Sequence, residues 1–196
     1  MDYFEVFGLE RKLQIDGEAL RRTFYELSRR HHPDFHAGAP ANEQARALEA
    51  SARLNAAYRA LRDPVARIEY LVRLEEGRDT KEGATVKPQA PPELLEEMFE
   101  IQEALVEARA GGVSDQATRR TLTAQRQALA ARYRDEEARL TGPLSAAWDA
   151  AVPAERQGLL GAFKQGLATR AYLKTVIEDL GQALGLEDNV VAHHRD

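Results

Sequence analysis

The sequence predicts an all-α protein, with a helical hairpin at the N-terminus followed by a C-terminal three-helix bundle. Apolar residues recur every three or four positions over long stretches, which is the spacing of amphipathic helices. Ala, Leu, Glu and Arg are abundant and β-branched residues are few, so no segment demands a sheet. A chain of 196 residues has room for one or two domains.

The first long helix is predicted to begin after Asp16, because a carboxylate at this position can cap the first helical turn. Its apolar stripe recurs at intervals of four and three residues and consists of Leu20, Phe24 and Leu27. A basic face lies opposite or beside this stripe, and its residues are Arg21, Arg22 and Arg29.

The tripeptide His32-Pro33-Asp34 is predicted to end this helix. Proline has no N–H to donate and disfavours helical geometry in the residue before it. The side chains of His32 and Asp34 are therefore expected on an exposed loop. His31 and His36 lie close by in sequence, but Pro33 interrupts any helix that would bring these groups to one face, so we predict no metal site.

A second long helix is predicted between Pro40 and the turn at Asp63-Pro64, antiparallel to the first. A short opening segment, residues 2–9, and a closing helix supply the remaining apolar cover. The predicted inward residues of the closing helix are Ile68, Tyr70, Leu71 and Leu74. Together these segments form a predicted first domain of residues 1–76.

Residues 77–91 are predicted to be a linker, because they lack a helical period and lead into three prolines within five residues. A helical bundle is predicted over residues 92–196. Its helices are expected at 92–110, 114–140 and 154–184, with breaks at Thr141-Gly142-Pro143 and at Pro153. The segment around Trp148 is ambiguous in sequence.

The first helix of the bundle is acidic, with six Glu and no Lys or Arg in residues 93–107. Its residues sort into a core stripe, a second apolar stripe and a stripe of glutamates. One interpretation is a wide core face with a solvated acidic edge, since charge runs usually lie at the surface. The other is a mixed apolar and acidic face on which a partner docks.

The N-terminal motifs resemble the J domain of chaperone partners. The resemblance rests on Asp2-Tyr3-Phe4, Phe7-Gly8-Leu9, His32-Pro33-Asp34 and the segment Asn55–Pro64, which occur in this order. With the Glu-rich helical C-terminal half, the chain is similar to the HscB family, the J-type co-chaperones of iron-sulfur cluster assembly. The alternative is a J-domain co-chaperone for a different protein client.

This resemblance implies that the chain stimulates ATP hydrolysis by an HscA or DnaK-type chaperone and delivers the iron-sulfur scaffold IscU to it. The residues implied in chaperone binding are His32, Pro33, Asp34, Arg21, Arg22 and Arg29. The chain itself is then not an enzyme and has no catalytic residue, because the chaperone hydrolyses the ATP.

The family binds its scaffold through apolar residues beside carboxylates on the acidic helix. Alignment with this pattern implies Leu95, Phe99, Glu100 and Glu103, together with an aromatic residue of the last helix, Tyr172. Glu96 falls where the family commonly has an apolar residue, unless the alignment shifts by one and Leu94 pairs with Leu95. A half-buried bundle tyrosine is an equally good interpretation of Tyr172.

The chain departs from the general J-domain pattern at three positions in two places. J domains usually have a basic residue directly after the tripeptide and further basic residues in the middle of the preceding helix. Here these places hold Phe35, Tyr25 and Glu26. Poor affinity for a general DnaK and preference for a dedicated chaperone would be consistent with this departure.

Composition argues against several other functions. The absence of cysteine excludes disulfides, thiolate catalysis and a thiolate-held cluster, and the sequence has no phosphate-binding glycine loop, so we predict no cofactor. A net charge of −5 argues against nucleic-acid binding. No apolar run is long enough to span a bilayer and no signal peptide is evident, so we expect a cytoplasmic protein, without membrane partners, that is monomeric.

Overall fold

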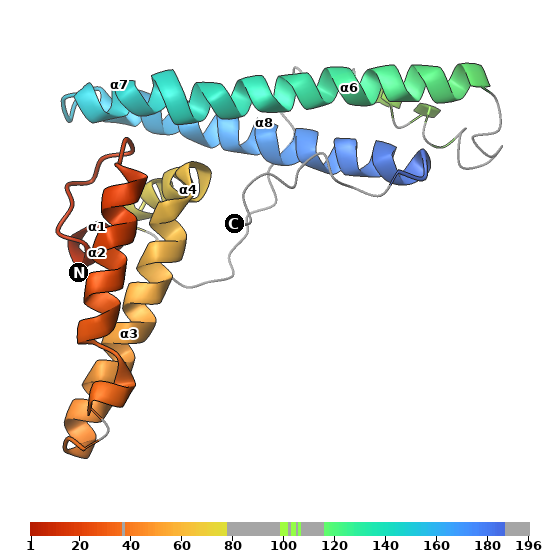
Figure 1. Ribbon diagram of the computed structural model, residues 1–196. Helices are drawn as coiled ribbons and strands as arrows, with labels where there is room; N and C mark the ends of the chain where they lie inside the picture. The colour runs from red at the N-terminus through yellow and green to blue at the C-terminus, as the bar shows by residue number, and fades with distance from the viewer. Residues whose placement is uncertain (37, 78–98, 102, 105, 107–115, 187–196) are drawn as a thin grey trace. The chain divides into compact units, whose positions relative to one another are not determined.

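The computed structural model describes residues 1–36, 38–77, 99–101, 103–104, 106 and 116–186 (Figure 1). All secondary-structure elements among these residues are helical, which confirms the predicted all-α class. The chain divides into two compact units. Unit 1 comprises Met1–Thr80 and Leu144–Arg156, and unit 2 comprises Lys81–Pro143 and Gln157–Asp196. The predicted linker, residues 77–91, falls outside the described residues apart from Gly77.

Unit 1 consists of short helices around a long hairpin. Its elements are α1 (Tyr3–Val6), α2 (Gly17–Arg30), a 3₁₀ turn η1 (Pro33–His36), α3 (Ala41–Arg62), α4 (Pro64–Glu75) and α7 (Ser145–Ala150). Asp16 caps α2 as predicted, because its carboxylate accepts hydrogen bonds from the backbone N–H groups of Glu18 and Ala19. Asp63 caps α4 in the same way, and Pro64 occupies the first helical position.

Aromatic contacts join the helices of unit 1. The rings of Phe24 on α2 and Tyr58 on α3 stack with their centroids 4.1 Å apart. Helices α4 and α1 are also joined, because the Tyr70 hydroxyl accepts a hydrogen bond of 2.8 Å from the backbone N–H of Tyr3. The predicted closing helix is confirmed as α4, in which Ile68 and Leu71 are fully buried.

The segment around Trp148, ambiguous in sequence, belongs to unit 1. Only 1% of the Trp148 side chain is exposed. The carboxylate of the next residue, Asp149, accepts hydrogen bonds from the backbone N–H groups of Leu13 and Gln14 at 2.7 and 2.8 Å. The guanidinium of Arg156 lies 5.1 Å from the Trp148 ring centroid. Helix α7 is therefore held in this unit by apolar burial and by hydrogen bonds to a charged group.

A buried arginine binds the same backbone segment that Asp149 binds. Arg67 of α4 is 4% exposed and donates hydrogen bonds to the backbone carbonyl oxygens of Leu61 and Leu13. Burial lowers the pKa of its guanidinium, and the nearby carboxylates of Asp63 and Asp149 act in the opposite direction. A buried cation needs such partners, because desolvation alone would cost several kcal/mol.

Unit 2 contains the helix α6 (Gln116–Arg139) and the greater part of α8 (Arg156–Ala183). Their core includes Ile101, Leu122, Leu129, Leu173, Ile177 and Leu180. On α6, Leu122, Leu129 and Tyr133 are buried, whereas Ala117 is exposed. Gly166 marks a close approach of the two helices, because an added Cβ would lie 2.5 Å from Oε1 of Glu136 on α6.

The predicted break at Thr141-Gly142-Pro143 is wrong. The chain remains helical there and forms a π-helical turn, η2 (Leu140–Leu144), that contains Pro143. A wider turn accommodates a proline that cannot donate the usual backbone hydrogen bond. None of the described helices has both the length and the apolar character needed to cross a membrane.

Candidate functional site

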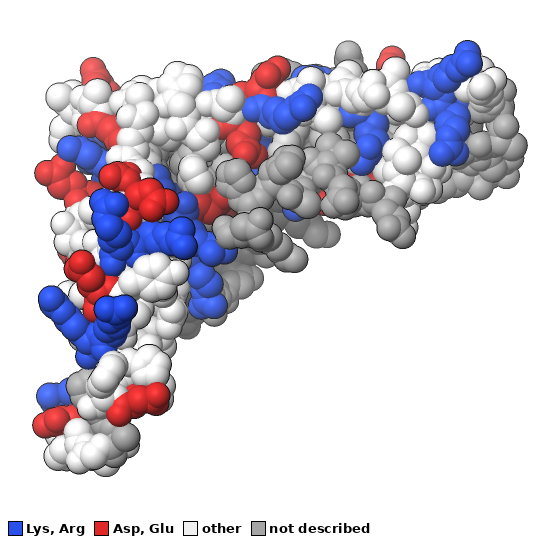
Figure 2. All heavy atoms as spheres, viewed as in Figure 1, with Lys and Arg blue, Asp and Glu red and all other residues white. Residues whose placement is uncertain are grey.

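The candidate site of unit 1 begins on α2. The buried Leu20 and the stack between Phe24 and Tyr58 hold one face of this helix against the hairpin. The helix carries four arginines and two glutamates. All four arginines are exposed, and they are Arg21, Arg22, Arg29 and Arg30. Figure 2 shows Lys and Arg side chains gathered over this part of unit 1, with a few acidic side chains among them.

Helix α2 ends just before the tripeptide, as predicted. Its last residue is Arg30, and the backbone N–H of His31 closes the final turn on the carbonyl oxygen of Leu27. The following segment was expected to be a loop, but it forms the 3₁₀ turn η1. This tighter geometry is a common way to leave an α-helix.

Short-range contacts fix the two polar side chains of the turn. The backbone N–H of Asp34 donates to Nδ1 of His32 at 3.3 Å, and one Asp34 carboxylate oxygen lies 3.6 Å from the same nitrogen. Because Nδ1 accepts a hydrogen bond, the neutral ring carries its proton on Nε2, which is then a donor. The side chains of His32 and Asp34 are 53% and 88% exposed. The turn therefore offers a carboxylate and an imidazole donor to a partner.

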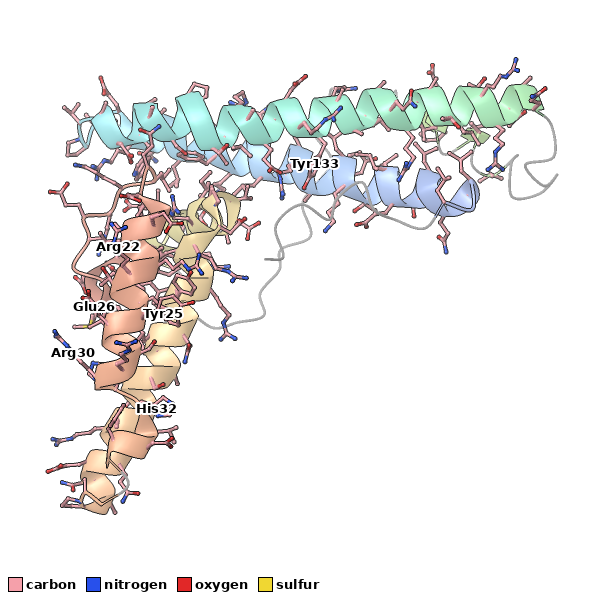
Figure 3. The ribbon with its side chains drawn as sticks, in the orientation of Figure 1. Arg22, Tyr25, Glu26, Arg30, His32 and Tyr133 are labelled. Carbon is pink, nitrogen blue, oxygen red and sulfur yellow. The ribbon has the colours of Figure 1, made fainter. Side chains whose placement is uncertain are left out.

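Two sides of α2 can be distinguished in Figure 3. Tyr25 and His32 lie along one side, and Arg22, Glu26 and Arg30 lie along the other. Tyr25 belongs to α2, whereas His32 follows the end of the helix at Arg30, so the turn after the helix places His32 on this side. Among the residues that the structure describes, no group of three or more His, Cys, Asp or Glu is arranged to hold a metal ion.

The predicted docking face of the bundle is described in part. Residues 99–101, 103, 104 and 106 are helical, and the buried Ile101 packs into the core of unit 2. Phe99 is 80% exposed, and Glu100 and Glu103 are exposed as well. Leu95 and its neighbours 94 and 96 lie outside the described residues.

Tyr172 has a different environment from Phe99. It lies on α8, is partly buried and packs against the core cluster of unit 2. Burial also raises the pKa of its hydroxyl. Val106, on the same helical stretch as Phe99, is also exposed, at 62%, and was not among the predicted site residues. Its spacing of seven residues from Phe99 was the signal that could have identified it.

Comparison with known proteins agrees with this geometry. Residues 2–70 match the family model of the DnaJ domain. The fold is similar to that of the chaperone HscB from Vibrio cholerae, with a TM-score of 0.59 and 27% identity over 94% of this chain and 99% of that one. The N-terminal part of the chain is a DnaJ domain, and the chain as a whole is similar to the HscB-type J co-chaperones. The human co-chaperone protein HscB has the same fold, with a TM-score of 0.60 and 22% identity over 93% of this chain and 81% of that one.

The match to the DnaJ domain covers α1 to α3 and most of α4. The tripeptide His32-Pro33-Asp34 lies inside this match. A J domain implies a partner among the Hsp70-type chaperones, so the exposed turn η1 is the natural candidate for the contact with that partner.

Proposed function

We propose that this chain is an HscB-type co-chaperone that stimulates the ATPase of an HscA or DnaK-type chaperone and delivers an IscU-type iron-sulfur scaffold to it. The observation that carries the proposal is the pair of exposed side chains, His32 and Asp34, at the end of an arginine-rich helix. Hydrolysis takes place in the chaperone, and the present chain supplies groups that bind and trigger it.

The turn acts through two contacts. The Asp34 carboxylate, 88% exposed, accepts hydrogen bonds from a cation of the chaperone, and an arginine suits this role because its guanidinium binds carboxylates in a bidentate manner. The His32 ring donates from Nε2. The hydrogen bond from the Asp34 backbone N–H to Nδ1 restrains the His32 ring next to Asp34.

The exposed arginines of α2 support the encounter between the two proteins. Arg21, Arg22 and Arg29 attract an acidic surface of the chaperone and raise the association rate, and added salt weakens this attraction. Their contribution is to rate and orientation more than to affinity, because exposed ion pairs contribute only about 0–1 kcal/mol each.

The scaffold-binding part of the proposal is supported by the exposed face of unit 2. Phe99 supplies a large aromatic side chain, and Glu100 and Glu103 place carboxylates on the same helical stretch. Aromatic residues surrounded by charged groups often carry most of the binding energy at protein interfaces. A scaffold surface with an apolar patch and a basic rim fits this chemistry.

The decisive experiment is single-turnover ATP hydrolysis by the chaperone, with wild-type protein and with Asp34→Asn, in the presence and absence of IscU. We expect stimulation that IscU amplifies and that Asp34→Asn abolishes. Asp135→Asn is a matched control, because Asp135 is also exposed but lies in unit 2 on α6. No stimulation at all would overturn the proposal, and stimulation indifferent to IscU would assign the client role to another protein.

The scaffold face has its own test. Phe99→Ala is expected to weaken IscU binding about tenfold or more, the loss typical of removing an aromatic anchor. Basal stimulation of the chaperone should not change. Leu186→Ala is the control, since Leu186 is a 40% exposed apolar residue of the same unit. Equal loss of both activities would indicate unfolding in place of a binding role.

A further inference from the structure

Unit 1 exposes two aromatic side chains next to the proposed chaperone contact. Phe35 is 75% exposed and Tyr25 is 54% exposed. Single exposed apolar residues are common on protein surfaces and need no explanation by themselves. The position of these two residues, which precede and follow His32 in sequence, is what makes them informative.

Phe35 is part of the same turn as His32. Its backbone N–H donates a hydrogen bond of 3.1 Å to the carbonyl oxygen of His32. The two rings meet edge to face, with centroids 6.1 Å apart and an angle of 75° between their planes. A partner that contacts the His32 ring and the Asp34 carboxylate therefore also meets the ring of Phe35.

Tyr25 lies on α2, on the same side as His32 (Figure 3). Its ring contacts that of Phe24, with centroids 5.6 Å apart, and Phe24 is itself stacked on Tyr58. The Arg21 guanidinium lies 5.8 Å from the Tyr25 ring centroid. These neighbours restrain the Tyr25 ring before any partner binds, which lowers the entropy lost on association.

The residue type at these positions changes which surface is complementary. A lysine or arginine beside His32 favours an acidic partner surface, whereas an exposed aromatic ring favours an apolar one. An apolar partner surface would in turn discriminate against a co-chaperone with cations there, because those cations would be desolvated without a partner. Tyr25 and Phe35 can thus favour one chaperone and disfavour another.

We propose that Tyr25 and Phe35 are the specificity-determining contacts of this co-chaperone, and that they pack against an apolar surface of a dedicated HscA-type chaperone beside the group that binds Asp34. This inference rests on the proposed function. The occupant is assigned by continuity, since the Phe35 ring contacts the His32 ring and Tyr25 lies on the same side as His32 in Figure 3. Neither ring has the burial expected of a core residue.

The test exchanges the aromatic residues for lysine, singly and together, as Tyr25→Lys and Phe35→Lys. Stimulation is titrated with a purified HscA-type chaperone and with a purified DnaK-type chaperone. We expect the half-saturating concentration for the HscA-type chaperone to rise about tenfold or more in the double variant, as for other interface aromatics. For the DnaK-type chaperone, the half-saturating concentration should fall in the double variant. The conservative variant Phe35→Leu should keep most of the preference.

A matched control is Val152→Lys, since Val152 is 56% exposed and follows α7. Helix α7 contacts residues 13 and 14, which precede the first residue of α2. The turn η1 follows the last residue of α2. The 14 residues of α2 separate these two ends of the helix by about 20 Å. This variant should stimulate both chaperones as the wild type does.

Three results would overturn the inference. The first is unchanged stimulation of both chaperones by the double variant, and the second is an equal loss with both, which would show general docking without specificity. The third is a lowered unfolding midpoint in the lysine variants, which would assign the rings a structural role. Asp34→Asn, measured in parallel, separates the two proposals: if it has no effect, the proposed function itself fails.

Discussion

The two ends of α2 are built in opposite ways. At the N-terminal end, the backbone before the helix is bound by Asp149 and Arg67, residues that are distant in sequence and partly or fully buried. At the C-terminal end, the turn at His32 and Asp34 is held by hydrogen bonds within four residues, and its side chains face solvent. One end uses its polar groups for folding, and the other leaves them available to a partner.

This difference separates stability from activity along a single helix. Hydrogen bonds to a charged group contribute about 1.5–3 kcal/mol, and more is lost when their removal leaves a buried donor without an acceptor. Substitutions of exposed side chains away from such contacts usually change stability by no more than about 0.5 kcal/mol. Changes at the first end should therefore unfold unit 1, and changes at the second should alter function alone.

The largest effect is expected for Trp148→Ala. Removing a tryptophan that is 1% exposed leaves a cavity and should lower the free energy of unfolding by about 3–5 kcal/mol. Urea unfolding followed by far-UV circular dichroism measures the loss. Val152→Ala removes an exposed side chain four residues later and should change little. A small loss in Trp148→Ala would mean that α7 does not stabilise unit 1.

Asp149→Ala should have the next largest effect. The substitution removes the acceptor for two backbone N–H groups and takes a carboxylate away from the buried Arg67, so we expect a loss of about 2–4 kcal/mol. Hydrogen exchange should accelerate at the amides of Leu13 and Gln14. The fluorescence of Trp148, the chain's single tryptophan, reports the unfolding of unit 1.

Asp135→Asn provides the comparison for this prediction, because it also neutralises a carboxylate but at an exposed site on α6. Its unfolding midpoint should match that of the wild type. If Asp149→Ala were equally silent, the two hydrogen bonds would not stabilise the fold, and the contrast between the two ends of α2 would disappear.

Asp16→Ala tests the start of α2 itself. The side chain caps the helix through Glu18 and Ala19, and its loss should cost about 1 kcal/mol. Asp16→Ser, which keeps a capping oxygen, should restore most of the stability. Both are measured by Trp148 fluorescence in urea. Equal losses in the two variants would show that charge at this position matters more than the capping hydrogen bond.

The sequence predicted those features of α2 that depend on neighbouring residues. The cap at Asp16, the end of the helix before Pro33 and the exposure of Asp34 follow from local chemistry. The role of α7 could not be predicted, because Asp149 meets Leu13 across 136 residues and no local pattern encodes that contact. Similarly, the local sequence Thr141-Gly142-Pro143 is compatible with a helix break as well as with the π-helical turn that forms, so it does not distinguish between them.

The candidate site shows the same limit. Sequence reasoning selected His32 and Asp34 by a motif, and Phe99 and Tyr172 by alignment with a family pattern. The exposure of Phe99 and the partial burial of Tyr172 depend on how α8 and the helical stretch around Ile101 pack, which only tertiary structure determines. Assignment of these two residues to scaffold binding remains a prediction.

The smallest effect on stability is expected at the exposed end of α2, for His32→Gln. The ring is 53% exposed and makes its hydrogen bond within the turn, so the free energy of unfolding should change by no more than about 0.5 kcal/mol. Glutamine is polar but lacks the rigid ring in which Nδ1 accepts the hydrogen bond from the Asp34 N–H while Nε2 remains free to donate to a partner. Stimulation of the chaperone ATPase should therefore be abolished while the Trp148 unfolding curve stays in place. A loss of several kcal/mol would make His32 a structural residue, and both ends of α2 would then serve the fold.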